Sequence, residues 1–120
     1  MLTKKTPETL AARLTIKGQG VENTLLLTYH NHNPDDFDAF RKNPESLKVP
    51  AELEKDQDAG IRFIQAQFCL FVVKSFDDGT DKEFPLTLEG LTELDRYWPG
   101  TLHGITKAYH SARGAAVEKN

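Results

Sequence analysis

Apolar and polar residues alternate along residues 10–17, and this period of two is typical of a half-buried β-strand. Gly18-Gln19-Gly20 follows with the composition of a tight turn, because glycine adopts positive φ angles without strain. Residues 24–30 form a second strand-like segment that places Leu25 and Leu27 on one face. The pattern predicts a β-hairpin. An isolated hairpin is marginal in water, so we expect its apolar face to rest on a helix or on a neighbouring chain.

The segment Asn33-Pro34-Asp35-Asp36 has the composition of a helix start. Asparagine is a good N-cap, proline suits the first helical position, and acidic residues favour the positive end of the helix dipole. We expect a short helix that ends near Asn43-Pro44, and then a loop over residues 43–50, which two prolines bracket. The highly charged residues 51–59 begin the next helix or precede it.

Residues 58–76 are predicted to form the central helix. Its apolar residues recur at helical spacing: Ile61, Ile64, Phe68, Phe71 and Val72. Phe63, Leu70 and Val73 widen this stripe beyond one face, as in a helix that is central in a core or shared with a partner. Periodicity alone leaves open whether residues 68–73 belong to this helix or form a strand.

The last third of the chain predicts two short helices that meet at Trp98-Pro99-Gly100. Thr87 is the expected N-cap of the first helix, Pro99 the start of the second and Gly114 its C-cap. The whole pattern predicts an α+β fold: an N-terminal β-hairpin followed by three to four helices packed as a small helical domain. We expect residues 1–9 to form a flexible leader, residues 10–114 a single domain, and residues 115–120 a frayed C-terminal tail.

Composition narrows the classes of partner. The net charge is −3 and no Lys/Arg-rich run exists beyond Lys4-Lys5, so the chain lacks the clustered cations that nucleic-acid binding requires. The mostly apolar run 68–73 is far too short to cross a bilayer, and we expect no membrane partner. Cys69 is the single cysteine, which rules out an internal disulfide and fits the reducing cytoplasm; its apolar neighbours predict a buried thiol.

Candidate chemistry is sparse. His30 and His32 lie two apart, which suits a pair of zinc ligands on one strand face, but a third ligand is not evident. His103 and His110 share a helix face, and the carboxylates sit in polar runs where solvation explains them. We therefore predict no catalytic residue, no cofactor and no metal site. A small metal- or ligand-binding regulatory module, built from His30, His32 and the carboxylates, stays open as an alternative.

Three segments together resemble the small tail assembly chaperones of long-tailed bacteriophages and prophages. Residues 25–40 (LLLTYHNHNPDDFDAF) combine a strand, a polar turn and a Pro-Asp-Asp-Phe helix start. Residues 71–83 (FVVKSFDDGTDKE) pair a hydrophobic segment with an acidic-glycine turn. Residues 84–120 contain a capped helix, an aromatic-Pro-Gly corner, a final helix with an Ala-Tyr pair and a short charged terminus. The resemblance covers about two thirds of the chain, and it rests on the order and spacing of these segments, since no single motif among them is specific.

This resemblance implies a non-catalytic protein. Members of the family coat the long, mostly helical tape measure protein before the tail tube polymerises around it, and they help to recruit tail tube subunits. They can self-associate, they act in the cytoplasm of the host bacterium, and they do not remain in the finished virion. A structural tail component is a further alternative.

The number of apolar residues agrees with a binding role. A carrier for an aggregation-prone client needs exposed apolar area on an otherwise polar chain. The candidate interface residues are Leu25 and Leu27 in the hairpin, and Phe63 and Leu70 in the central helix, because a small core does not obviously need all of them.

Overall fold

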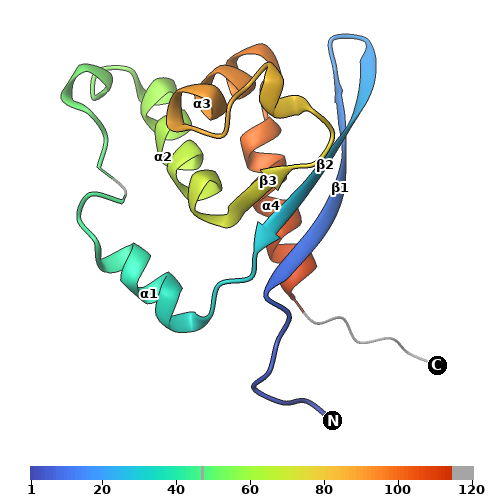
Figure 1. Cartoon of the computed structure of the whole chain (residues 1–120). Helices are drawn as coiled ribbons and strands as arrows, with labels where there is room; N and C mark the ends of the chain where they lie inside the picture. Colours follow the sequence, from blue (N-terminus) through green and yellow to red (C-terminus); the bar gives the residue numbers. More distant parts are fainter. Residues whose placement is uncertain (47, 115–120) are drawn as a thin grey trace.

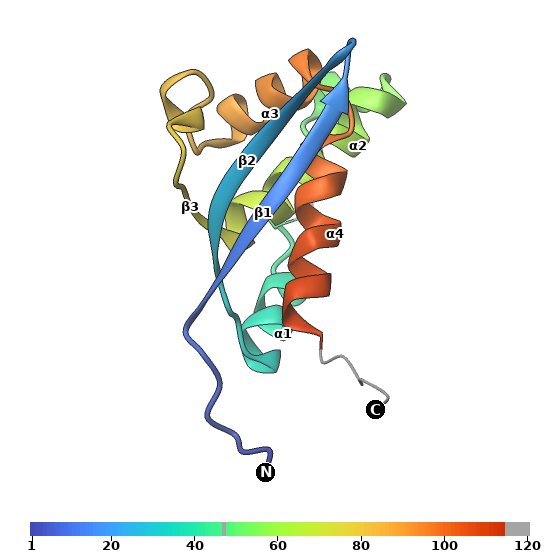
Figure 2. The same cartoon turned by 90° about the vertical axis from the view of Figure 1, so that its right-hand side faces the viewer.

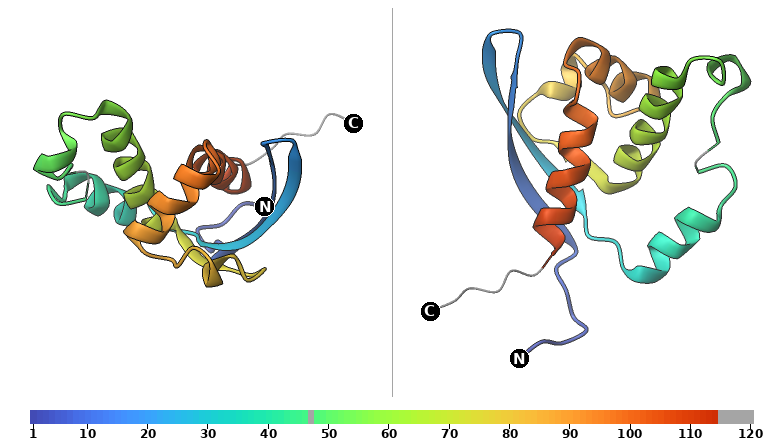
Figure 3. Two further views of the ribbon diagram at one scale, coloured as in Figure 1. Left: turned by 90° about the horizontal axis from the view of Figure 1, so that it is seen from above. Right: turned by 180° about the vertical axis from the view of Figure 1, so that it is seen from behind.

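The structure is a computed structural model, and it describes residues 1–46 and 48–114. An antiparallel hairpin of β1 (Thr9–Gly18) and β2 (Val21–His30) is followed by α1 (Pro34–Lys42), α2 (Gln57–Val72), β3 (Val73–Phe76), α3 (Leu88–Tyr97) and α4 (Thr101–Arg113). Two short 3-10 turns span Ala51–Leu53 and Thr80–Lys82. The hairpin lies along α4 at one side of the molecule, and α1 and α2 lie toward the other (Figure 1, Figure 3). This confirms the predicted α+β fold. The predicted tail, residues 115–120, lies outside the described residues.

The predicted hairpin is present and regular. Its strands pair from Thr9 opposite His30 to Gly18 opposite Val21. The two loop residues, Gln19 and Gly20, both have positive φ angles of 54° and 79°, the conformation that matches the twist of a two-residue hairpin. The Gln19 side chain also donates a hydrogen bond of 2.7 Å to the carbonyl of Tyr97, which fixes the hairpin tip to the end of α3.

Helix α1 begins as predicted. The Asn33 side chain accepts a hydrogen bond from the amide of Asp36, and the Asp36 side chain accepts one from the amide of Asn33. This reciprocal capping box satisfies two amides that would otherwise lack partners at the helix start. The carboxylates of the first turn therefore stabilise the helix end.

The single helix predicted over residues 58–76 is wrong at its C-terminal end. The helix stops at Val72, and Val73–Phe76 form β3, which pairs antiparallel with β2. The physical reason is that β2, which lies far away in the sequence, has an unpaired edge to which residues 73–76 can bond. The pattern within residues 58–76 alone gives no sign of this partner strand. Asp77 and Asp78 extend the connection, because the Asp77 amide donates to the carbonyl of Leu26 and a carboxylate oxygen of Asp78 accepts from the Leu26 amide at 2.9 Å. The sequence left open whether residues 68–73 form helix or strand. Residues 68–72 belong to α2, and Val73 is the first residue of β3.

Helices α3 and α4 meet at the predicted corner, with one difference. Thr87 caps α3 as expected, whereas α4 begins at Thr101 and not at Pro99, because Gly100 precedes it with a φ of 93°. Gly100 has no side chain to cap the helix. The buried Asp95 of α3 takes that role, since one of its oxygens accepts from the Leu102 amide at 3.1 Å while the other accepts from Arg62 of α2 at 3.1 Å. Gly114 is the C-cap, as predicted.

The core joins the sheet to all four helices. Its buried apolar residues are Leu25, Leu27, Tyr29, Phe37, Ala66, Cys69, Val72, Val73, Phe76, Leu91, Leu94, Leu102, Ile105 and Tyr109.

Cys69 is buried as predicted, and burial raises the pKa of its thiol to about 12, which makes it a poor nucleophile. None of the described helices has the length and apolar character needed to cross a membrane.

Candidate functional site

Helix α2 exposes apolar side chains that the core does not use. Ile61, Ile64 and Leu70 are 48%, 36% and 37% exposed. The face of α2 that enters the core instead carries Ala66, Cys69 and Val72. Of the apolar stripe seen in the sequence, Ile61 and Ile64 are therefore exposed, whereas Val72 is buried.

The orientation of α2 has a specific physical cause. Arg62 lies between the two exposed isoleucines in sequence, and its guanidinium reaches the buried carboxylate of Asp95 on α3. A buried carboxylate is costly without a paired partner, so this contact turns the Arg62 side of α2 toward α3. Ile61 and Ile64 then point toward solvent.

An apolar groove lies between α1, α2 and the start of α3. Its volume is about 250 Å³, and it is lined by Phe40, Ser46, Gln67, Leu70, Phe71 and Leu88. The rings of Phe40 and Phe71 stack with centroids 4.3 Å apart and an interplanar angle of 13°. Phe71 and Phe40 also line a neighbouring hollow with His32, Asp36, Ala39, Asn43 and Ser46. The stacked pair is thus shared by two adjoining depressions along α1.

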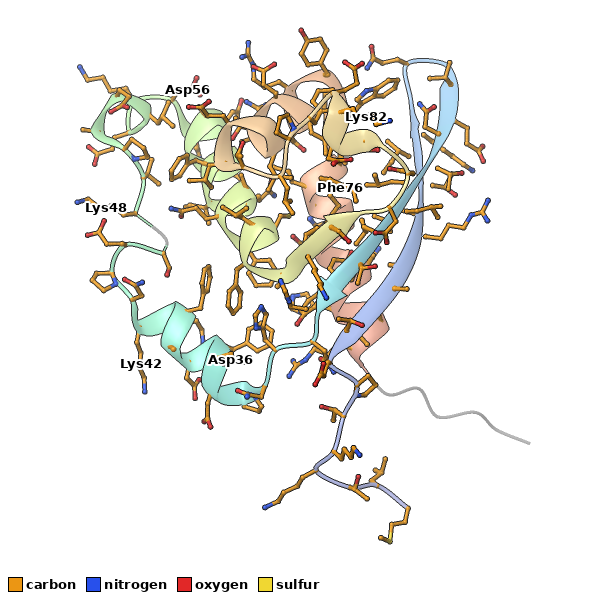
Figure 4. The ribbon with its side chains drawn as sticks, viewed as in Figure 1. Asp36, Lys42, Lys48, Asp56, Phe76 and Lys82 are labelled. Carbon is orange, nitrogen blue, oxygen red and sulfur yellow. The ribbon has the colours of Figure 1, made fainter. Side chains whose placement is uncertain are left out.

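His32 holds α1 beside α2. Its ring stacks on Phe71 with centroids 3.9 Å apart and an interplanar angle of 3°. Its Nε2 lies 2.7 Å from the carbonyl oxygen of Phe71, and because a carbonyl only accepts, Nε2 carries the proton. Its Nδ1 lies 3.5 Å from a carboxylate oxygen of Asp36 at the start of α1. Figure 4 labels Asp36 and Lys42 at the two ends of this helix, with aromatic side chains between α1 and α2.

One polar atom near the groove lacks a partner. Gln67 donates through Nε2 to the carbonyl of Glu45 at 3.4 Å, but its buried Oε1 has no hydrogen-bond partner among the described residues. An unpaired buried acceptor raises the energy of the free protein.

The predicted interface residues separate into two groups. Leu25 and Leu27 are 5% and 1% exposed and belong to the core, so the structure removes them from the candidate surface. They are buried because the inner face of the hairpin rests on the helices of its own chain. Leu70 lies in the groove and is exposed, and Phe63 is half-buried on the same helix. Sequence reasoning missed Phe40, Phe71 and Leu88 as lining residues; the excess of phenylalanine in α1 and α2 was the available signal.

Several carboxylates and histidines that the sequence offered as candidates have structural contacts. Asp77 accepts hydrogen bonds from Thr28 and Ser75, which hold its pKa below the ordinary value. The His30 and His32 rings lie 5.5 Å apart, and desolvation, followed by the neighbouring His32 and Lys74, lowers the pKa of His30. Among the described residues, no three histidine, cysteine or carboxylate side chains are placed to hold a metal ion. The arrangement suits the binding of an apolar partner.

Comparison with known proteins gives no further guide to this site. No family model, no curated protein and no solved structure matches the chain.

Proposed function

We propose that this protein is a non-catalytic tail assembly chaperone of a phage or prophage, which binds the tape measure protein through the groove that Leu70 of α2 lines. The observation that carries the proposal is the exposure of Leu70 in an apolar groove that Phe40, Phe71 and Leu88 also line. Scattered single apolar residues are ordinary on protein surfaces, but an exposed apolar residue that lines an apolar groove favours a binding site.

The shape of the groove favours a helical client. Residues of α1 and α2 line it, and among them the rings of Phe40 and Phe71 stack on each other. An amphipathic helix binds such a groove by laying its apolar stripe onto it, with side chains at i, i+3, i+4 and i+7 as anchors. A tape measure protein is long and mostly helical, so many of its segments present such a stripe.

The proposed mechanism is the exclusion of water from the client. Before assembly, the apolar stripe of the client is exposed and prone to aggregate. Burying that stripe against Leu70, Phe40 and Phe71 removes apolar area from both partners, which stabilises the complex by about 25 cal/mol for each Å² buried before the costs of association are subtracted. Release follows when tube subunits compete for the same stripe. Several copies act along one client, in the cytoplasm of the host.

The proposed role excludes chemistry on the client. What supports this part of the proposal is that the nearby polar groups are already engaged: His32 with Phe71 and Asp36, and Asp36 with the cap of α1. Recruitment of tail tube subunits, self-association and absence from the finished virion are further parts of the same proposal.

Leu70→Asp is expected to abolish client protection while leaving the fold intact. Leu70 is exposed, so the charge stays solvated in the free protein, but it would be buried without a partner in the complex. Loss of a central interface anchor typically costs about 2 kcal/mol or more, so we expect client affinity to fall at least about tenfold. The measurement is co-expression with the tape measure protein, which the proposal expects to be encoded beside this chain's gene, followed by quantification of soluble, co-purified client.

Val21→Asp is the matched control. Val21 is also exposed, but it lies at the hairpin turn and does not line the groove. Equal client recovery with wild type and with Leu70→Asp would contradict the proposed site. Detection of the chain in purified virions would instead favour a structural tail component.

A further inference from the structure

Strand β1 has an open edge. The sheet order is β1-β2-β3, so β1 pairs with β2 on one side only. Figure 2 shows β1 at the margin of the sheet, beside α4. An edge strand of ten residues presents a row of backbone groups that can template another strand, and proteins usually protect such an edge.

The register identifies which backbone groups face outward. A two-residue hairpin loop makes its flanking residues, here Gly18 and Val21, a hydrogen-bonded pair, and such pairs alternate along the ladder. The even-numbered residues of β1 therefore bond to β2. The bond from the Asn31 amide to the Glu8 carbonyl continues the same parity beyond the strand. The outward N–H and C=O groups belong to Ala11, Arg13 and Thr15, and no described residue bonds to them.

A groove beside this edge leaves room for an additional strand. Its volume is about 550 Å³, and it runs between β1 and α4. On the helix side it is lined by small residues, Gly104, Ala108, Ser111 and Ala112, which recur on one face of α4. A larger side chain at these positions would fill the space that a neighbouring strand requires. The open backbone and the adjoining space are two independent features of one place.

The charge of this edge is positive, although the whole chain is acidic. Arg13 and Lys107 are the charged residues among those that line the groove. Arg13 forms no ion pair with any described residue, and Lys17 on the same exposed face of β1 has only a solvent-exposed partner, Glu22, at 4.0 Å. Directly opposed residues on neighbouring strands interact, and opposite charges stabilise the pair. A fourth strand with acidic side chains opposite Arg13 and Lys17 would match this face.

We propose that the open edge of β1 binds an extended, acidic segment of another protein chain as a fourth strand of the sheet. The bound segment alternates small apolar residues, which contact Gly104 and Ala108, with acidic residues on the exposed side. Backbone hydrogen bonds give the affinity, and the charges give the choice of partner. A second copy of this chain is a poor occupant, because pairing two β1 strands would bring the Arg13 and Lys17 side chains of both copies onto one face. This surface shares no lining residue with the groove of α2, so the two proposals stand separately.

The test uses capped nine-residue peptides that alternate valine with glutamate, or valine with lysine. Each is titrated into the isotope-labelled full chain while backbone amide shifts are recorded by NMR. The glutamate peptide is expected to shift the amides of Ala11, Arg13 and Thr15, and the lysine peptide is expected not to bind. Arg13→Glu should lower the affinity for the glutamate peptide about tenfold, because it replaces an attractive charge pair with a repulsive one.

A proline variant separates backbone pairing from charge attraction. Thr15→Pro removes one outward N–H without touching the ladder to β2, and proline is tolerated on sheet edges. It should lose binding, whereas Thr15→Val, which keeps the N–H, should retain it. Three results would overturn the proposal: no shifts along β1 at millimolar glutamate peptide, equal binding by both peptides, or binding that survives Thr15→Pro in a folded protein. Concentration-dependent shifts along β1 without peptide, together with dimer mass in light scattering, would assign the edge to a second copy.

Discussion

Gly90→Ala is expected to destabilise the protein strongly, although alanine normally favours a helix over glycine. Gly90 lies in the first turn of α3, and a Cβ atom there would collide with the backbone of Pro85, with the carbonyl carbon at 2.7 Å and the nitrogen at 2.8 Å. The collision is with backbone, so no side chain can rotate away. We expect a loss of about 2–3 kcal/mol in the free energy of unfolding, after subtraction of the helix propensity that alanine gains. Urea denaturation measures it.

Gly104→Ala is the matched control, because the same substitution in α4 meets no atom within 4 Å. Here only propensity acts, and we expect the protein to gain about 0.5–1 kcal/mol. Opposite signs for the two variants would confirm that close contact with Pro85, and not helix propensity, requires glycine at position 90. A stable Gly90→Ala protein would show that α3 starts farther from Pro85.

Tyr29→Ala is expected to have the largest effect on stability. Tyr29 is fully buried between the sheet and α4, its ring meets that of Tyr109 edge-on with centroids 5.0 Å apart, and its hydroxyl donates to the Ile105 carbonyl at 2.7 Å. Removing a buried aromatic ring costs about 3–5 kcal/mol, because a cavity remains where the ring packed. In a domain of this size that is a large part of the total stability, so we expect the variant to be partly unfolded at 37 °C.

Tyr29→Phe isolates the hydroxyl. It keeps the ring and loses one neutral hydrogen bond, which is worth about 1 kcal/mol. Thermal and urea unfolding of the two variants should therefore differ by several kcal/mol. Similar losses for both variants would mean that the hydrogen bond, and not ring packing, joins the hairpin to α4.

The helix starts and the hairpin could be predicted from the sequence, because they depend on residues that lie close together in the chain. Asn33 and Thr87 cap their helices where the sequence placed them, since capping involves residues only three positions apart. The hairpin followed from strict alternation and a glycine-containing turn. Strand β3 was missed because its pairing with β2 joins residues that are about fifty positions apart, and a pattern within one segment carries no information about that partner.

The candidate site was only partly predictable. The apolar excess of α2 was visible in the sequence, and Leu70 was correctly placed outside the core. The exposed face was not predictable, because α2 is apolar on most of its surface and the contact between Arg62 and Asp95 decides which side faces inward. The groove could not be predicted for a related reason: its lining brings together Phe40 of α1 and Phe71 of α2, which are about thirty positions apart in sequence.

The central claim is that the groove between α1 and α2, which Leu70 lines, binds the client. Hydrogen exchange of the chain alone and in complex with the co-purified tape measure protein tests it most directly. The account predicts that protection on binding is greatest at α1 and α2, around Phe40, Leu70 and Phe71, and that the Leu70→Asp protein shows none. Protection confined to other elements, with α2 exchanging at the same rate in the free and the mixed samples, would contradict it.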